Sequence, residues 1–204
     1  MLDVEGFILV GGASSRMGSN KAHLAFGEQT GVQRIAAELA SLTDRIRVVG
    51  SHDGTPDSGF ENVPDVLEQW GALGGIHSAL QACQKGWAIV VACDLPLVTR
   101  DLFGRLWEVN SKMFDAVVPL QPDGRPQPLC ALYRRETIKA QTTRLIAEGE
   151  HMPRALLDQV RTRWIEFGEL ADLSGSENFF LNVNTPKDYE LARQILEAES
   201  RVAG

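Results

Sequence analysis

The stretch Phe7-Ile8-Leu9-Val10-Gly11-Gly12 decides the fold, because an apolar run stops abruptly there at two glycines. A run this short, bounded by a turn signal, predicts a buried strand. A polar, glycine-bearing loop then extends to about Gly27, and Thr30 with Gln33 has the spacing of a capping box that opens a helix. The chain is therefore expected to begin with a strand, a glycine-bearing loop and a helix.

The same alternation continues along the rest of the chain. Apolar runs predict further strands at residues 45–49, 87–93, 115–120, 129–133 and 163–167. Helical spacing or N-capping residues predict helices at residues 73–84, 137–148 and 153–159, after Thr99, and after Thr185-Pro186. Residues 51–62 are rich in turn formers and predict a loop. The pattern indicates an α/β fold with a mostly parallel sheet, helices on both faces, and one antiparallel hairpin near residues 122–133.

Length and composition limit the possible functions. The chain has 204 residues, of which 44% are hydrophobic and 23% charged, and its net charge is −7. The length predicts a single domain over residues 1–204, and the composition is that of an ordinary folded protein. An acidic chain is poorly suited to bind long nucleic acids through their phosphates, so no nucleic-acid partner is expected. It can still bind a small phosphate compound where positive side chains gather locally.

The lengths of the apolar runs, and the spacing of the cysteines and histidines, exclude further classes of protein. No apolar run approaches the ~20 residues that span a bilayer, and residues 1–5 lack the features of a secretory signal. We therefore expect a cytoplasmic protein with no membrane partner. The three cysteines are widely spaced and odd in number, and the four histidines show no HxxxH spacing. Neither a zinc site nor a disulfide framework is expected, and the cysteines are interpreted as reduced, partly buried thiols.

The loop after the first strand is a candidate phosphate site. Gly11 and Gly12 carry no Cβ, so a phosphate can approach their backbone N–H groups closely. Arg16 and Lys21 add two positive charges, and no acidic residue lies between positions 6 and 28. The loop is neither a Walker loop nor a dinucleotide fingerprint, because the lysine and the third glycine are misplaced. The alternative is a glycine-rich surface turn with two solvated cations.

A carboxylate follows the most apolar strand, in the stretch Val91-Ala92-Cys93-Asp94-Leu95-Pro96. A carboxylate at the end of a buried strand needs a partner, because burying an unpaired charge is costly. A magnesium ion that bridges phosphate oxygens is one such partner, since Mg²⁺ takes only one or two protein carboxylates. Asp94 is therefore a candidate metal ligand; the alternative is an ordinary N-cap or turn aspartate.

Two asparagines precede the last predicted helix, in Asn182-Val183-Asn184-Thr185-Pro186. At alternate positions of an extended segment their amides point the same way, where they can ligate Mg²⁺ or hold a phosphate. Helix capping alone explains Thr185 but not Asn182.

A weaker candidate joins Asp65 to Gly71-Ala72-Leu73-Gly74-Gly75. Three glycines ahead of a helix suggest the close approach of a ligand or of a neighbouring strand. The alternative is a loop without function.

These motifs together resemble the MobA-like nucleotidyltransferase family, over nearly the whole chain and in the expected order. The resemblance implies a nucleotide-diphospho-sugar-transferase-like, Rossmann-type fold. It also implies a reaction in which GMP passes from GTP to the phosphate of a molybdenum-bearing pterin, with Mg²⁺ as cofactor and release of pyrophosphate. The implied partners are GTP and a molybdopterin-type acceptor, with transient contact to molybdoenzyme maturation proteins.

The resemblance also assigns roles to the candidate residues. The implied nucleotide-binding residues are Leu9, Val10, Gly11, Gly12, Lys21, Asp65, Gly74 and Asp94. Arg16, Lys21 and Asp94 are the catalytic candidates. Asp94 and Asn184 are the metal candidates, and Asn182 and Asn184 lie on the acceptor side.

Three alternatives remain open at this point. Relatives that use CTP look more like Leu-Ala-Ala-Gly in the first loop, whereas Gly11-Gly12 and residues 71–75 favour GTP. The acceptor could be another phosphorylated compound, such as a sugar or polyol phosphate. The chain could also be a nucleotide-binding partner protein without turnover.

The chain departs from the family pattern at two positions. These are Val10, where Ala is usual, and Gly50, where guanylyl-transferring members often carry Asn.

Overall fold

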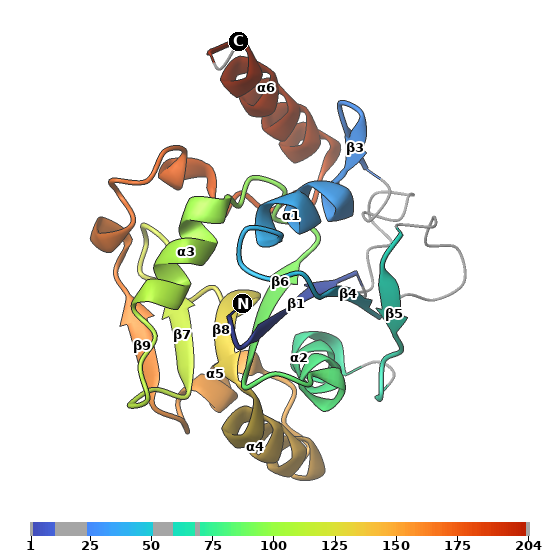
Figure 1. Ribbon diagram of the computed structural model, residues 1–204, viewed down its shortest axis with the longest axis vertical. Coiled ribbons are helices and arrows are strands. Elements are labelled where there is room, and N and C mark those ends of the chain that lie inside the picture. The colour runs from blue at the N-terminus through green and yellow to red at the C-terminus, as the bar shows by residue number, and fades with distance from the viewer. Residues whose placement is uncertain (1, 11–23, 51–58, 68–69, 203–204) are drawn as a thin grey trace.

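A seven-stranded sheet forms the centre of the molecule, in the order β5-β4-β1-β6-β8-β7-β9 (Figure 1). The structure is a computed structural model that describes residues 2–10, 24–50, 59–67 and 70–202. The strands of the sheet are β1 Val4–Leu9, β4 Ile46–Val49, β5 Glu61–Val63, β6 Trp87–Ala92, β7 Ala116–Pro119, β8 Cys130–Arg134 and β9 Thr162–Ile165. The helices are α1 Gly31–Leu39, α2 Gly71–Ala82, α3 Arg100–Glu108, α4 Arg135–Ala147, α5 Pro153–Leu157 and α6 Pro186–Val202.

Strand direction confirms the predicted mixed sheet. β1 pairs in parallel with both β4 and β6, β4 with β5, and β7 with β9. β8 runs antiparallel to β6 and to β7, so β7 and β8 form the expected hairpin. All strands of this sheet except β8 therefore end at the same edge, which we call the carboxyl edge.

Helices cover both faces of the sheet, as predicted. α1 and α3 pack on one face, where their apolar residues meet Ile8 of β1 and Ile89 of β6. α2, α4 and α5 pack on the other face, against Phe7 and Val90. Neighbouring strand residues thus enter opposite cores, because side chains alternate across a strand. Figure 1 shows the two helical layers above and below the sheet.

Two short strand elements were missed by the sequence reading. Residues 61–62 were expected in a loop but belong to β5, an edge strand in which only Val63 is buried. A separate hairpin joins β2 Ala25–Phe26 to β3 Gln29–Thr30, within and just after the predicted glycine-bearing loop. Both elements are too short, and too exposed, to show an apolar alternation.

Helix caps agree with the sequence. Thr30 and Gln33 form the reciprocal capping box at the start of α1, with bonds of 2.9 and 3.2 Å. Thr99 caps α3 through the N–H of Leu102. The start of α2 differs, because the helix begins at Gly71, two residues before the predicted start, and therefore contains all three glycines of the motif at residues 71–75.

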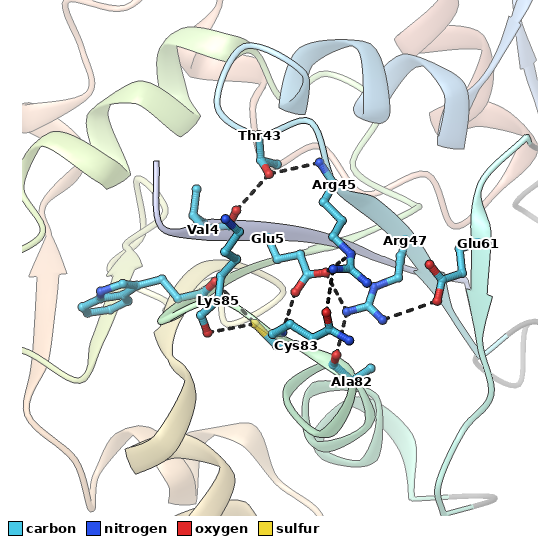
Figure 2. A network of polar contacts seen from close by, with 11 residues as sticks. Val4, Glu5, Thr43, Arg45, Arg47, Glu61, Ala82, Cys83 and Lys85 are labelled. Carbon is cyan, nitrogen blue, oxygen red and sulfur yellow. Dashed lines mark hydrogen bonds and ion pairs between the residues drawn. The ribbon is translucent and has the colours of Figure 1, made fainter. Parts of the chain in front are cut away.

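A buried ionic network lies toward the amino end of β1 (Figure 2). The carboxylate of Glu5, which is fully buried, accepts hydrogen bonds from Arg47 and from the backbone N–H of Gln84, both at 2.7 Å. Arg45 lies 2.8 Å from the same carboxylate, and Arg47 also faces Glu61 of β5 at 3.6 Å. The network joins β1, β4 and β5 to the end of α2.

The structure also bears on the expectations of reduced cysteines and of a chain without membrane-spanning segments. Cys83 and Cys130 are buried free thiols, and Cys93 is half-buried. Burial raises the pKa of Cys83 to about 12 and also raises that of Cys130, so both stay protonated near neutral pH. In the described part of the chain, every helix is too short or too polar to cross a bilayer.

Candidate active site

Four neighbouring strands end in one row at the carboxyl edge. Leu9 of β1 pairs with Val49 of β4 on one side and with Ala92 of β6 on the other, and Val49 pairs with Val63 of β5. The segments that follow these strands therefore start side by side. Ligands of open α/β sheets bind outside the carboxyl ends of the strands, so this row is the expected place for a site.

The strand order reverses between β1 and β6. From β1 the chain moves through α1 to β4 and then β5, and α2 leads it back past β1 to β6. The N–H of Cys93 donates to Leu9 O at 3.0 Å, and that of Val10 donates to Val49 O at 2.9 Å. Leu9, Val10 and Asp94 thus meet at the switch point, where such folds bind nucleotides. Four predicted residues, Gly11, Gly12, Arg16 and Lys21, lie outside the described residues.

The asparagine motif lies beside Asp94. The N–H of Val183 donates to the carbonyl of Asp94 at 2.9 Å, which joins the end of β6 to the segment before α6. Val183 is buried, whereas Asn182 is half-buried and Asn184 is exposed on either side of it. The amide of Asn182 donates to Phe180 O at 3.1 Å. Tertiary structure therefore brings together two motifs that are almost ninety residues apart in the chain.

The start of α6 fixes the end of this asparagine segment. The carboxylate of Asp188 accepts from the N–H groups of Asn184 and Thr185 at 3.1 and 2.8 Å, and the Thr185 hydroxyl accepts from the N–H of Asp188. The hydrogen bond with Thr185 lowers the pKa of Asp188, so its carboxylate is ionised, and accepts these hydrogen bonds as an anion, at neutral pH. Capping thus involves Thr185 and the backbone of Asn184, and Asn182 lies outside it.

Asp65 belongs to the other end of the row. It is half-buried and follows β5 by two residues. The N–H of the next residue, Val66, donates to the hydroxyl of Ser78 at 3.0 Å, and that hydroxyl donates to Gly74 O. The strands that Asp65 and Asp94 follow lie three strand spacings apart, roughly 14 Å. The two carboxylates are therefore suited to different parts of an elongated ligand.

Ser78 contacts the segment that carries Asp65, and the sequence analysis did not single it out. Its side chain is fully buried on α2 and joins this helix to the segment after β5. The available signal was a hydroxyl among the apolar residues Ile76, Ala79 and Leu80 of the helix.

The glycines of α2 have a packing explanation. A Cβ at Gly74 would lie 2.6 Å from Cβ of Trp70, and one at Gly75 would lie 3.0 Å from Cδ1 of Leu9. The close approach of a neighbouring strand thus accounts for Gly75, which faces Leu9 of β1, whereas Gly74 packs against Trp70, the residue that precedes its own helix. The role of Gly74 in nucleotide contact stays a prediction.

Gly50 accounts for one departure from the family pattern. It directly follows β4, its φ is 85°, and its N–H donates to Val63 O at 3.1 Å. This left-handed conformation is open to glycine and, among other residues, mainly to asparagine. Gly and Asn thus both suit this backbone position.

An aromatic pair also lies beside the start of α2. The rings of Trp70 and His151 stack with centroids 4.1 Å apart and an interplanar angle of 18°. Trp70 precedes α2, and His151 lies between α4 and α5, so the pair joins the two helical segments on one face of the sheet. No local pattern in the sequence indicated this contact.

A metal ion at the switch point stays a prediction from the sequence. Within residues 2–10, 24–50, 59–67 and 70–202, no three His, Cys, Asp or Glu side chains gather closely enough to hold a metal ion. Magnesium is commonly held by one or two protein ligands together with water and substrate phosphates. Asp94 and Asn184 stay the predicted ligands of such an ion.

Comparison with known proteins identifies the relatives of this chain. A model of the MobA-like NTP transferase domain matches residues 6–163. A probable molybdenum cofactor guanylyltransferase from Bacillus cereus is 33% identical over 202 residues, which cover 95% of this chain and 98% of the relative. One of the same description from Pelotomaculum thermopropionicum is 34% identical, with 97% and 95% covered.

Solved structures show the same fold. The molybdopterin-guanine dinucleotide biosynthesis protein A of Archaeoglobus fulgidus superposes with a TM-score of 0.80 at 22% identity, covering 95% of this chain and 99% of the other. A 2-C-methyl-D-erythritol 4-phosphate cytidylyltransferase of Thermus thermophilus superposes with a TM-score of 0.67 at 17% identity, covering 94% and 98%. At these identities the likeness concerns the fold alone.

Proposed function

The chain belongs to the MobA-like NTP transferase family, and from this premise we propose that it is a molybdenum cofactor guanylyltransferase. It transfers GMP from GTP to the phosphate of molybdenum-bearing molybdopterin and releases pyrophosphate. The proposal rests on two curated relatives of that description, each matched over nearly its full length. The observation that carries it in the structure is the bond between Val183 and Asp94, which joins the asparagine motif to the end of β6 beside β1.

The reaction places few chemical demands on the protein. The attacking group is a phosphate oxygen that is already anionic, so no strong general base is needed. Catalysis then consists of alignment and of neutralising charge. Lys21 and Arg16 offset the charge that builds on the α-phosphate and on the pyrophosphate leaving group. The backbone N–H groups of Gly11 and Gly12 hold the phosphates.

The two ends of the row then have separate tasks. Asp94 works beside the reacting phosphates, and the asparagines next to it face the acceptor side. Asp65 follows β5, roughly three strand spacings away, and contacts a different part of the nucleotide. Leu9 and Val10, at the end of β1, lie between the two.

Magnesium is the proposed cofactor. Asp94 and Asn184 would hold it, and when bound it neutralises charge on the triphosphate oxygens. We further expect the protein to act in the cytoplasm and to pass its product to molybdoenzyme maturation proteins through transient contacts.

Nucleotide binding is the first test of this function. Calorimetric titrations with GTP, CTP, ATP and UTP, each with Mg²⁺, should show that GTP binds most tightly. Release of pyrophosphate from GTP should then require molybdenum-bearing molybdopterin. Preference for CTP would reassign the base, and binding without release would favour a nucleotide-binding partner protein. Turnover with another phosphorylated acceptor would keep the transferase and change its substrate.

A further inference from the structure

A small third core joins the segments that carry the candidate site. Phe26, Leu97, Val183 and Ala192 are its buried residues. The partly buried residues packed against it are Leu24, Leu181, Tyr189, Ile195 and Leu196. This satellite core brings α6 together with three stretches that stand close in sequence to site residues. Leu24 follows Lys21 by three positions, Leu97 follows Asp94 by three, and Val183 separates the two asparagines.

Tyr189 of α6 makes two contacts with the hairpin β2–β3. Its hydroxyl donates a hydrogen bond to the carbonyl of Ala25 at 2.5 Å. Its ring meets that of Phe26 edge-on, with centroids 5.3 Å apart and an interplanar angle of 66°. Figure 1 shows the start of α6 beside this hairpin. A residue of the last helix thus holds a segment that is 164 positions earlier in the chain.

The hairpin depends on such contacts for its position. Its strands have two residues each, and among the described residues they pair only with one another, apart from the seven-stranded sheet. A lone two-stranded hairpin is marginally stable in water, so its surroundings must fix it. On one side it continues into α1, where the N–H of Gly31 donates to Leu24 O at 3.0 Å. On the other side Tyr189 and the satellite core hold it.

The opposite side of Tyr189 is also fixed. Its N–H donates to Thr185 O at 3.1 Å, within the cap that follows the asparagine motif. The guanidinium of Arg193 lies 5.9 Å from the centre of its ring. Tyr189 therefore connects the asparagine segment, which is bonded to Asp94, with the hairpin: its backbone N–H contacts the first and its side chain the second.

We propose that Tyr189 is a positioning residue for the nucleotide. By holding Ala25 and Phe26, it fixes the hairpin that follows the glycine-bearing loop in the chain, relative to the segment that is bonded to Asp94. The inference rests on the proposed function, because the loop is assigned to the phosphates of GTP. Tyr189 itself is not expected to touch the substrate.

Kinetics of conservative variants test this inference. Tyr189→Phe keeps the ring and removes the hydroxyl, and Tyr189→Ala removes both contacts. Leu191→Ala is the matched control, since Leu191 is exposed on the same helix. We expect Tyr189→Phe to raise the KM for GTP about fivefold, as loss of one hydrogen bond allows, while the KM for the acceptor stays within twofold. Tyr189→Ala should raise the KM for GTP further, and Leu191→Ala should leave it unchanged.

A purely structural role predicts a different result. Partial unfolding reduces the amount of active enzyme, which lowers the apparent kcat and leaves the KM for GTP unchanged. A wild-type KM for GTP in Tyr189→Phe would therefore overturn the inference.

Hydrogen exchange separates this inference from the proposed function. Amides of residues 24–31 should exchange faster in Tyr189→Phe than in the wild-type protein, and Leu191→Ala should match the wild type. If the wild-type protein fails to release pyrophosphate from GTP, the proposed function fails. The hydrogen-exchange rates then test by themselves whether Tyr189 holds the hairpin. Equal exchange in Tyr189→Phe and wild type would then overturn its role in holding the hairpin.

Discussion

At the scale of single residues, Asp94 is the described candidate that the structure connects most directly to another predicted motif. It follows β6, a strand in which every residue is buried, by two positions, and its carbonyl accepts from the N–H of Val183 in the asparagine segment. A carboxylate at this position, near the asparagine segment and the proposed triphosphate, is expected to contribute through its negative charge and not by transferring a proton.

Loss of charge at Asp94 or Lys21 should therefore affect turnover more than folding. We expect Asp94→Ala and Lys21→Ala each to lower kcat by about 100-fold or more, with unchanged circular dichroism. In a Mg²⁺ titration of activity, Asp94→Asn should need more magnesium than the wild type. Near-native turnover of both alanine variants, or an unchanged magnesium titration, would contradict the assignment.

Because Gly75 has no side chain, α2 packs closely against Leu9, and a single methyl group at this position would crowd the Leu9 side chain. A Cβ there would lie 3.0 Å from Leu9, whereas one at Gly104 of α3 would have open space. Gly104→Ala should gain about 1 kcal/mol in the free energy of unfolding from helix propensity alone. In Gly75→Ala, crowding should offset that gain by roughly 1–3 kcal/mol.

Denaturant unfolding of both variants measures the difference. The double variant Gly75→Ala, Leu9→Val should recover part of the loss, because a shorter side chain makes room for the methyl group. Equal stabilisation by the two single alanine substitutions would show that Leu9 is not crowded.

At the scale of elements, the buried carboxylate of Glu5 holds several strands together. It joins β1 to two arginines of the segment that forms β4, and it also accepts from the N–H of Gln84, just after α2. The network lies away from the carboxyl edge, so its expected effect is on stability and not on nucleotide contact.

Neutralising Glu5 should be costly. Glu5→Gln leaves Arg47, whose side chain is 5% exposed, without its nearest charge partner, and we expect a loss of roughly 3 kcal/mol in the free energy of unfolding. Glu61→Gln is the control, because the Glu61 side chain is 63% exposed and 3.6 Å from Arg47, and it should cost less than about 1 kcal/mol. Equal midpoints in urea for the two variants would contradict this account.

At the scale of the whole molecule, α2 and α4 meet through a buried histidine. Nδ1 of His77 lies 3.0 Å from the Thr142 hydroxyl, and Nε2 lies 3.3 Å from the amide of Gln81. Burial, and secondarily the charge of Lys139, lowers the pKa of His77 below its ordinary value of 6.5. The folded protein therefore favours the neutral ring.

This shift predicts how stability depends on pH. Because the unfolded chain binds the proton more readily, the contribution of His77 is fully present above pH 6.5 and is lost as the pH falls below it. Between pH 7 and 5.5, the free energy of unfolding should fall more steeply for the wild type than for His77→Gln. Parallel curves for the two proteins would show that His77 does not set this dependence.

Much of the fold could be predicted from the chain because the signals are local. The apolar run before Gly11, the capping box at Thr30 and the cap at Thr185 each depend on residues within a few positions of one another. The motif around Asp94 was likewise visible, because it directly follows a strand without polar residues. The family resemblance drew on the same local motifs.

The sequence by itself determined the alternation of strands and helices, the mixed sheet and the motifs at the ends of its strands. Only the tertiary structure decided the pairing of β5 with β4, the bond between Val183 and Asp94, and the hydrogen bond from Tyr189 to Ala25. The physical reason is that periodicity and capping act between neighbours in the chain. Contacts between distant segments depend on how whole elements pack, and they leave no mark on the local pattern.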